Sequence, residues 1–407
     1  MKIAYITAAV PWGNGESFII DEMLQMKCEK SKIVIIPRNP SKEIFHQEAR
    51  KLVDNSLWLP LVNLEMLFIL ICTLFTRPKI FKLIFKLIVN SRSFLIFIKN
   101  IAVLPKGVYL SRYCKMHNIE HIHAHWGSTT ATLAYIISEM TDIPWSFTVH
   151  RWDITENNML KTKAASARFI RCISQIGLEE VISIVGEQFK PKVKLIHMGV
   201  HIGEIRNKSI VWKEPITLVC PANLLPVKGG QYLIDACKQL VEKEINNFRC
   251  IFIGDGPMEA ELKSQVKNLD LEPYVQFIGR ISHDKLMRMY ANEEVDIVVL
   301  PSINTDDGEH EGVPVALMEA MAYSIPVIST NTGGIPELLN GDAGYIVEEK
   351  NPLQLACAVQ ALINDPHHAR KYSEQGFRRV YKDFNIVLNT KCLFNLIMTS
   401  TLTDEMP

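Results

Sequence analysis

The chain alternates short apolar runs of strand length with segments of helix length, and it does so in two successive rounds. Such alternation is typical of parallel β-sheets whose strands are joined by crossover helices. In the first round we expect strands at Ile3–Thr7, Ile33–Pro37, Ile119–Ala124, Trp145–Val149 and Phe169–Ser174, and helices at Phe18–Lys27, Thr129–Glu139 and Leu178–Gly186. In the second we expect strands at Ile216–Cys220, Arg249–Ile253, Val275–Ile278, Asp296–Leu300 and Pro326–Ser329, and helices at Gly230–Leu240, Met258–Lys267, His283–Tyr290 and Pro314–Ala322. The pattern predicts an α/β protein of two doubly wound, Rossmann-like domains.

The length of 407 residues also fits two domains. The chain turns polar near Val200–Pro215, which predicts a linker, so we expect an N-terminal domain over residues 1–205 and a C-terminal domain over 206–380. Hydrophobic residues make up 48% and charged residues 22%, a globular mixture that excludes a disordered chain.

Lys and Arg number 44, as do Asp and Glu, so a surface built as a whole to hold nucleic acid is excluded. Nine scattered cysteines without a C-x-x-C pair predict reduced, mostly buried thiols in a cytosolic protein. The N-terminal apolar run is short and meets Pro11 and Trp12, which favours a first strand over a signal peptide.

One part of the N-terminal domain, residues 57–115, is a basic and apolar insert. Between Met66 and Ile119 there is no acidic residue, and the basic residues are Arg77, Lys79, Lys82, Lys86, Arg92, Lys99, Lys106, Arg112 and Lys115. The longest uncharged apolar run, Met66–Thr76, has about half of the ~20 residues that a membrane-spanning helix needs. We therefore do not expect this run to cross a membrane.

Lys79, Lys82 and Lys86 fall at helical spacing, with apolar residues filling the remaining positions. This pattern is typical of a helix lying in the interface of an anionic membrane. The alternative is a helix packed on the protein core with a solvated lysine face.

The loop that follows the buried strand Val295–Leu300 is the densest in polar residues. Gly312 permits a tight turn, and Pro314 suits the first helical position, so we expect a helix to begin at about Val313. The free N–H groups at such a helix start suit a phosphate or diphosphate.

Two carboxylates accompany this helix start, Glu311 before it and Glu319 in its second turn. Carboxylates accept hydrogen bonds from vicinal hydroxyls, the ordinary way to hold a sugar or a ribose. A phosphate site beside two hydroxyl acceptors indicates a nucleotide-sugar. The alternative is an acidic surface loop capping an ordinary helix.

Two further residues follow expected strands. Lys228 precedes a glycine-started helix, where it would neutralise phosphate charge; the alternative is a solvated loop lysine. His150 closes the strand Trp145–Val149 and projects from the carboxyl end of that strand into the expected cleft; the alternative is a structural histidine.

His123 and His125 resemble a metal pair, but no third ligand has suitable spacing, so we expect no metal and suppose that they line the cleft or hold the loop. Gly13 and Gly15 let the first loop approach a ligand closely, although Asn14-Gly15 is also a plain turn signal. Gly13 and Gly15 are therefore candidate donor-binding residues.

Several of these segments resemble one known family. Glu311-x7-Glu319, followed by Thr332-Gly333-Gly334-Ile335-Pro336-Glu337, is similar to the signature of retaining glycosyltransferase family 4, whose fold is GT-B. The similarity extends to Thr148-Val149-His150, Lys228-Gly229, Gly254-Asp255-Gly256-Pro257 and Phe277-Ile278-Gly279-Arg280. The first loop, Gly13-x-Gly15-Glu16-Ser17-Phe18-Ile19, and the basic insert further resemble the colanic-acid-type enzymes that build bacterial exopolysaccharides on polyprenyl-diphosphate acceptors.

The resemblance implies a role for each matched residue. Glu319 would bind the donor ribose, Glu311 the hydroxyls of the transferred sugar, and Lys228 the diphosphate. His150 would be the active-site histidine near the transferred sugar, and the backbone around Gly279–Ile281 would contact the nucleobase. Gly312 and Val313 would lie at the donor.

The chain departs from the family where a Gly-Arg pair is usual. It has Pro221-Ala222-Asn223-Leu224 there, and Asn223 cannot supply the positive charge. Lys228 and the helix N-termini would then have to suffice, or Arg280 or Arg151 would compensate.

The function that the resemblance implies is retaining transfer of a sugar from a UDP- or GDP-sugar to a lipid-linked saccharide, without a bound metal or cofactor. The C-terminal domain would bind the nucleotide-sugar and the N-terminal domain the acceptor. The two domains would face each other across a cleft, residues 381–407 would form a helix that returns to the N-domain, and the protein would lie on the inner face of the cytoplasmic membrane. One alternative, suggested by Asn223, is a noncatalytic nucleotide-sugar-binding partner of a polysaccharide assembly complex. A GT-B epimerase is another, and the Glu-x7-Glu pattern argues against it.

Overall fold

The computed structural model describes residues 1–13, 16–28, 32–203 and 212–402. It divides the chain into two compact units. Unit 1 consists of Met1–Met198 together with Ile386–Pro407, and unit 2 consists of Gly199–Asn385. Residues 204–211, in the expected linker, and Gly15 lie outside the described residues.

The sheet of unit 1 has six strands in the order β2-β1-β3-β4-β5-β6, and each neighbouring pair is parallel. The strands are β1 Lys2–Thr7, β2 Lys32–Pro37, β3 His121–His125, β4 Trp145–Val149, β5 Ile170–Cys172 and β6 Val193–Leu195. The helices are η1 Ser17–Ile19, α1 Ile20–Cys28, η2 Glu48–Asn55, α2 Leu64–Thr76, α3 Lys79–Asn90, α4 Phe94–Ala102, α5 Leu104–Met116, α6 Thr129–Thr141, α7 Arg151–Glu156, α8 Leu160–Ser166, α9 Gln175–Val185, η3 Glu187–Lys192 and α17 Ile386–Leu402.

Both faces of this sheet are buried, as a parallel sheet with crossover helices requires. Along β1, Ala4 and Ile6 join the cluster on the side of α5 and α6, whereas Ile3 and Tyr5 join the cluster on the side of α1 and α17. The alternation follows from the two-residue period of a strand.

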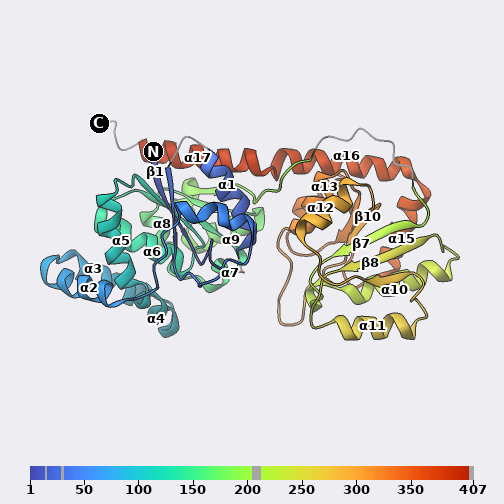
Figure 1. Cartoon of the computed structure of the whole chain (residues 1–407), viewed down its shortest axis with the longest axis horizontal. Coiled ribbons are helices and arrows are strands. Elements are labelled where there is room, and N and C mark those ends of the chain that lie inside the picture. The colour runs from blue at the N-terminus through green and yellow to red at the C-terminus, as the bar shows by residue number, and fades with distance from the viewer. Residues whose placement is uncertain (14–15, 29–31, 204–211, 403–407) are drawn as a thin grey trace. The chain divides into compact units, whose positions relative to one another are not determined.

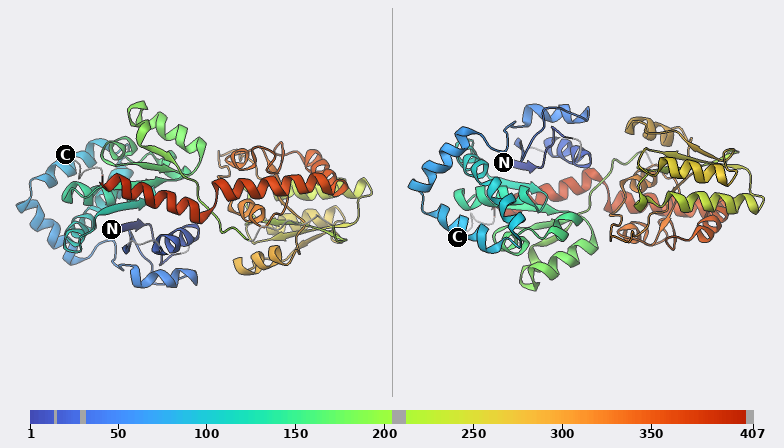
Figure 2. Two further views of the ribbon diagram at one scale, coloured as in Figure 1. Left: turned by 90° about the horizontal axis from the view of Figure 1, so that it is seen from above. Right: turned by 90° about the horizontal axis from the view of Figure 1, so that it is seen from below.

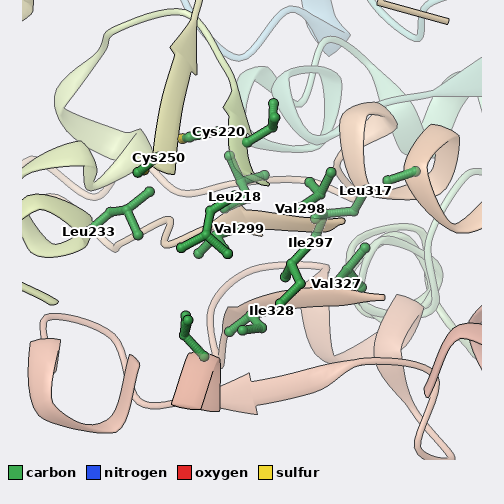
Figure 3. Packing of buried hydrophobic residues seen from close by; sticks show 14 of the residues in the cluster. Leu218, Cys220, Leu233, Cys250, Ile297, Val298, Val299, Leu317, Val327 and Ile328 are labelled. Carbon is green, nitrogen blue, oxygen red and sulfur yellow. The ribbon is translucent and has the colours of Figure 1, made fainter. Parts of the chain in front are cut away.

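The sheet of unit 2 is likewise parallel, in the order β12-β11-β10-β7-β8-β9. Its strands are β7 Ile216–Pro221, β8 Phe248–Ile253, β9 Val275–Phe277, β10 Ile297–Leu300, β11 Val327–Thr330 and β12 Tyr345–Val347. Its helices are η4 Pro226–Lys228, α10 Gly230–Glu242, α11 Glu259–Asn268, α12 His283–Ala291, α13 Val315–Ala322, α14 Ile335–Leu339, α15 Pro352–Asn364 and α16 Pro366–Asp383. Figure 3 shows part of its core, where Leu218 of β7 and Val298 of β10 pack with Leu233 of α10 and Leu317 of α13.

Two parallel sheets with covering helices confirm the predicted α/β class (Figure 1). Each strand that the sequence predicted is present, with ends shifted by up to two residues. The edge strands β6 and β12 were not predicted.

The expected start of the helix after β10 is wrong. The helix after β10 begins at Val315, not at Val313, because Pro314 takes an extended conformation (φ −72°, ψ 120°) and precedes the helix as its N-cap. The C-terminal helix expected within residues 381–407 corresponds to α17: α16 ends at Asp383 in unit 2, and α17 begins at Ile386 and packs on α1 in unit 1.

The insert forms helices α2 to α5. Helix α5 is packed against α6, and a Cβ on its Gly107 would lie 2.5 Å from Cγ2 of Ile136. Helices α2, α3 and α4 lie at the edge of unit 1, as both views in Figure 2 show. The insert therefore has an inner helix that belongs to the core and an outer group of three.

Candidate functional site

In unit 2 the loops after β7 and β10 meet. Lys228 lies at the end of η4, and its ammonium group pairs with the Glu311 carboxylate. Gly229 allows this approach: its φ is +64°, and a Cβ there would lie 2.0 Å from the backbone oxygen of Pro301. The two side chains are 22% and 16% exposed, so the pair remains accessible from solvent.

A second glycine holds the Glu311 loop from the other side. Gly333 has a φ of +55°, and a Cβ on it would lie 1.9 Å from the backbone oxygen of Glu311. The Gly334 N–H donates to the same oxygen at 3.3 Å, and the Ser302 hydroxyl donates to Glu311 Oε2, also at 3.3 Å. The Thr332-Gly333-Gly334 motif thus packs against the backbone of Glu311 and holds that loop in place.

Glu319 lies in α13 and has a different partner. Its Oε1 is 2.7 Å from Nε2 of His283, the first residue of α12, and the carboxylate is 16% exposed. Both glutamates that the sequence predicted as site residues therefore contact a polar side chain. Glu311 contacts Lys228, and Glu319 contacts His283. His283 was not predicted, since nothing in the sequence links it to a residue 36 positions away.

Arg280 and Asn223 lie near the same edge of the sheet. Arg280 donates to Oδ1 of Asp255 at 2.8 Å, and this hydrogen bond raises the pKa of Arg280. The bond joins two of the matched motifs, the one that contains Asp255 and the one that ends at Arg280. Asn223 is exposed and lines, with Lys228, a crevice of about 10 Å³, which has room for about one water. Arg151, the other candidate to replace the missing arginine, belongs to unit 1 and pairs with Glu180 at 2.8 Å.

Gly312 and Val313 lie just before α13. Gly312 does not have a positive φ, so the turn does not require a glycine, and a Cβ there would meet no described atom within 4 Å. Val313 is half-buried against the core of unit 2. The open space above Gly312 lies beside Glu311.

In unit 1, His150 ends a chain of buried hydrogen bonds. Its Nε2 is 2.8 Å from Nε2 of His125, whose Nδ1 is 3.0 Å from the Tyr5 hydroxyl. Tyr5 donates to Glu22 at 2.7 Å, and Arg171 donates to the other oxygen of Glu22 at 2.6 Å. All five side chains are buried.

This series of hydrogen bonds determines which ring nitrogen of each histidine carries the proton. The single hydroxyl hydrogen of Tyr5 goes to Glu22, so Tyr5 accepts from His125 Nδ1–H. Nε2 of neutral His125 is then an acceptor, and we assign the proton between the two rings to Nε2 of His150. Burial, together with the Arg171 charge, lowers the pKa of His150 to about 3, so the ring is neutral near pH 7.

Each ring nitrogen of His123 and His125 has a protein partner, and His123 is fully buried, so it does not line a cleft. The nitrogens of His123 lie 2.8 Å and 3.0 Å from the hydroxyls of Ser146 and Thr148, and those of His125 face Tyr5 and His150. Within the described residues no group of three or more His, Cys, Asp or Glu side chains has the arrangement of a metal site.

The first loop of unit 1 is held by Glu16, a residue to which the sequence assigned no role of its own. Its carboxylate accepts from the backbone N–H groups of Ala8 (3.0 Å), Ala9 (2.6 Å) and Val10 (3.0 Å), and from the indole of Trp126. Gly13 has a φ of +151°, and a Cβ there would lie 2.7 Å from the Cβ of Ala9. The loop is therefore anchored next to the ring of Trp126, which packs on His150 with a centroid distance of 4.4 Å.

The three lysines of α3 do not form one free cationic face. Lys79 lies 3.4 Å from Asp142 and Lys86 lies 2.8 Å from Glu139, both acids at the C-terminal end of α6, while Lys82 is exposed. The apolar residues of α3 are also split between a buried and an exposed set. The large apolar residues that face solvent are Phe81, Phe85, Ile88 and Val89.

The outer face of the insert is unusually apolar. Its exposed large hydrophobic residues are Leu64, Leu67, Phe68, Ile71 and Phe75 of α2, Phe81, Phe85, Ile88 and Val89 of α3, and Phe94, Leu95 and Ile98 of α4. We call this set the outer apolar face. Soluble monomers rarely leave so many large apolar side chains together at the surface, so this face indicates a binding surface.

One helical stretch of the described chain, Phe94–Met116, is long and apolar enough to span a membrane by length and composition. Within its apolar window 56% is buried inside the structure, and α5 within it packs on α6. The core helix of a globular domain has the same properties.

Residues 202–379 match the family model described as Glycosyl transferases group 1. This segment contains Lys228, Glu311 and Glu319. Its limits are close to those of unit 2.

The chain is also similar to curated proteins. It is 32% identical over 212 residues to the Salmonella typhimurium protein named putative colanic acid biosynthesis glycosyltransferase WcaL, covering 51% of each chain. It is 34% identical over 173 residues to the Erwinia amylovora protein named amylovoran biosynthesis glycosyltransferase AmsK, covering 42% of each. The matched region thus spans about half the length of these relatives, or less.

Among solved structures, the Anabaena protein HepE, crystallised with UDP, superposes with a TM-score of 0.71 at 16% identity, over 98% of this chain and 100% of that one. At that identity the likeness bears on the fold alone, and it agrees with the predicted GT-B class. The chain therefore carries a Glycosyl transferases group 1 domain over residues 202–379, within a two-domain α/β fold of the GT-B type.

Proposed function

We propose that this protein is a retaining glycosyltransferase of bacterial exopolysaccharide biosynthesis. It takes a sugar from a UDP- or GDP-sugar and transfers it to a saccharide carried on a polyprenyl diphosphate. The observation that carries the proposal is the contact between Lys228 and Glu311, inside the segment that matches the group 1 family model. The names of WcaL and AmsK support the pathway, and the UDP bound to HepE supports a nucleotide donor.

The chemistry follows from the charges at this contact. The Lys228 ammonium group has three N–H donors, so it can keep Glu311 and still donate to a diphosphate oxygen. Negative charge grows on the diphosphate as it leaves, and a nearby cation stabilises that charge. Glu311 then accepts a hydroxyl of the transferred sugar, and Glu319 a hydroxyl of the ribose.

The transfer is proposed as a front-face displacement. The bond from the anomeric carbon to the diphosphate oxygen breaks as the acceptor oxygen bonds to the same face. The acceptor proton passes to the departing phosphate, so no covalent enzyme intermediate is needed. His150, neutral and held through Nε2, is the group of unit 1 that would face the transferred sugar.

No bound metal is part of the proposal. Lys228 supplies the positive charge that a divalent cation supplies in other transferases. The ring nitrogens of His123 and His125 are already engaged by neighbouring hydroxyls and by His150.

We further propose that the protein lies peripherally on the inner face of the cytoplasmic membrane through the outer apolar face. Lys82 and Arg92 are exposed beside it and would contact anionic headgroups, while Lys79 and Lys86 fasten α3 to α6. Phe81 and Phe85, which are 58% and 64% exposed, would enter the lipid.

The test is release of nucleoside diphosphate from a panel of UDP-, GDP-, ADP- and dTDP-sugars, with and without a membrane extract as source of acceptor. The proposal requires release from a UDP- or GDP-sugar, increased by the extract. A β-linked product from an α-linked donor would contradict retention.

The second candidate function is a noncatalytic nucleotide-sugar-binding partner of a polysaccharide assembly complex. The observation that favours it is exposed, uncharged Asn223 at the position of the family's arginine. Donor binding without release from any donor, with or without the extract, would select this alternative.

A further inference from the structure

Trp126 has a backbone conformation that a tryptophan rarely takes. It follows β3 directly, and its φ is +102°. Among the other described residues that carry a side chain, the positive φ values lie between +47° and +63°, the ordinary left-handed region. Trp126 lies outside that region. Strain of this kind is costly and persists only where the surrounding structure imposes it.

Hydrogen bonds on both sides of Trp126 hold this conformation. Its N–H donates to the backbone oxygen of Thr148 at 3.1 Å, and its carbonyl accepts from the Thr130 hydroxyl at 2.8 Å. Thr148 belongs to β4 and Thr130 to α6. The backbone of Trp126 is thereby tied to two elements of unit 1.

The two residues that follow are fixed as well. The carbonyls of Gly127 and Ser128 accept from the ammonium group of fully buried Lys163, at 2.7 Å and 2.9 Å. A Cβ on Gly127 would lie 2.8 Å from Cγ1 of Val149, so a side chain there would displace Val149. The turn after β3 is therefore not free to relax, and the fold maintains the strain at Trp126.

The strained backbone places an indole ring beside His150. The two rings pack with their centroids 4.4 Å apart and their planes at 32°. Phe18 of η1 packs on the same imidazole at 5.4 Å and meets the indole edge-on at 5.9 Å. Together with the hydrogen bond to His125, these rings leave His150 8% exposed. The indole is thus one of the groups that determine how the imidazole can turn.

Packing of apolar surface does not by itself account for the strain. Trp126 is half-buried and does not belong to the buried core of unit 1. A side chain that only filled space would be placed more cheaply on a relaxed backbone. Strained residues gather instead beside groups whose position matters for function.

We infer that Trp126 is a positioning residue of the proposed transfer. Its strained backbone holds the indole against the imidazole of His150, so that the imidazole keeps the orientation in which it faces the transferred sugar. Trp126 acts through His150 and not through a contact with the substrate. This inference rests on the proposed function, which gives His150 its role.

The first test compares the stabilities of Trp126→Gly and Trp126→Ala. Both changes remove the indole, but glycine adopts a positive φ without strain and alanine does not. The urea midpoint should therefore be higher for the glycine variant, the reverse of the usual order. Trp58 is the matched control, because it is a 45% exposed tryptophan of unit 1 without a positive φ, and its alanine variant should be at least as stable as its glycine variant. The same order at Trp126 would overturn the inference.

The second test measures kcat and KM with membrane extract and the donor that gives nucleoside diphosphate release in the panel assay. Trp126→Gly should lower kcat about tenfold or more, since small misplacements of a reacting group have effects of that size. The donor KM should stay within about threefold, because Glu16 keeps its bonds to the backbone of the first loop. Trp58→Gly should keep the unsubstituted kcat.

A double variant tests whether the effect passes through His150. Trp126→Gly combined with His150→Ala should be no slower than His150→Ala alone, because the ring that Trp126 positions is already absent. Losses that multiply in the double variant, or a raised KM with unchanged kcat in Trp126→Gly, would overturn the positioning role.

A nuclear magnetic resonance measurement needs no donor. The ¹⁵N shifts of the His150 ring should show one tautomer, Nε2–H, in the unsubstituted chain and in Trp58→Gly, because Nε2 faces His125. In Trp126→Gly the ring can turn away from His125, so a second tautomer should appear. A single tautomer in all three proteins would overturn the inference. A second tautomer in Trp126→Gly, with no release from any donor by the unsubstituted chain, would contradict the proposed function and leave the placement of His150 by Trp126 standing.

Discussion

Nε2 of His150 lies 2.8 Å from Nε2 of His125, and this contact joins the end of β4 to a buried chain that reaches Arg171. A histidine with one nitrogen occupied in this way cannot rotate freely. His150 therefore presents a fixed ring in a fixed protonation state, which suits the proposed role of facing one atom of a bound sugar.

The first prediction concerns Tyr5, the link between Glu22 and His125. Tyr5→Phe keeps the buried ring but removes the hydroxyl, so Glu22 loses a donor and His125 an acceptor. We expect the free energy of unfolding to fall by about 1–3 kcal/mol. Urea denaturation followed by circular dichroism measures the change.

Tyr290→Phe is the matched control. Tyr290 is equally buried, but its hydroxyl has no hydrogen-bond partner within the described chain. Its removal should not lower stability. If Tyr290→Phe lowered the free energy of unfolding as much as Tyr5→Phe does, the hydrogen bonds of the Tyr5 hydroxyl would contribute nothing of their own to stability.

The second prediction concerns Lys228. Lys228→Ala removes the cation at the proposed diphosphate and is expected to reduce nucleoside diphosphate release by about 100-fold or more, since preorganised charge at a leaving group is worth that much. Lys263→Ala, at an exposed lysine of α11 paired with Glu259, should leave the rate unchanged. The measurement is the steady-state rate of nucleoside diphosphate release by the two variants. A Lys228→Ala rate within a few-fold of the unsubstituted rate would contradict the proposed role of Lys228 at the diphosphate.

The third prediction is a pH dependence of stability. Burial lowers the pKa of His121 from 6.5 to about 3, so between these values the unfolded chain binds a proton that the folded chain does not. This contribution to stability is complete above pH 6.5 and is lost as the pH falls toward 3. Thermal unfolding midpoints between pH 7 and pH 4 should therefore decrease with acidity.

His121→Asn tests the origin of that decrease. An amide can still bond to the hydroxyls of Ser146 and Thr401, which His121 contacts at 2.8 Å and 2.9 Å, but it does not titrate. The decrease with acidity should become smaller. His117→Asn, at an exposed ring, should keep the full decrease, and an equal effect of the two changes would contradict the assignment to burial.

The fourth prediction concerns the outer apolar face. The double change Phe81→Ser and Phe85→Ser is expected to reduce co-flotation with phosphatidylglycerol vesicles several-fold without lowering the unfolding midpoint, because both rings are largely exposed. Leu353→Ser, at a 55% exposed leucine of unit 2, is the control. Unchanged flotation of the double variant would rule out this face as the membrane contact.

The sequence allows the fold to be predicted closely because the strands are apolar, β-branched and regularly spaced. It also identifies Lys228 and Glu311, since each follows a strand and the carboxyl ends of neighbouring strands β7 and β10 share one edge. Their direct contact required the structure, because it depends on where Gly229 and Pro301 bring the two loops together.

The buried chain behind His150 could not be predicted. Tyr5, Glu22 and Arg171 come from three distant segments, and the one local signal is the alternation of His121, His123 and His125 along β3. The orientation of α3 could not be predicted either, because the acids that pair with its lysines lie at the C-terminal end of α6, more than fifty residues away. Local periodicity shows that a helix is amphipathic but not which of its faces another element covers.

The most direct test of the central claim is transfer itself. The purified chain is incubated with membrane extract and with the donor that gives nucleoside diphosphate release in the panel assay, labelled in its sugar. The label in the organic-soluble lipid fraction is then compared with the nucleoside diphosphate released. We predict one labelled sugar in lipid for each diphosphate released above the acceptor-free rate, and loss of both in Glu319→Ala. Donor bound by the chain with no label reaching lipid, or equal labelling by Glu319→Ala, would contradict the account.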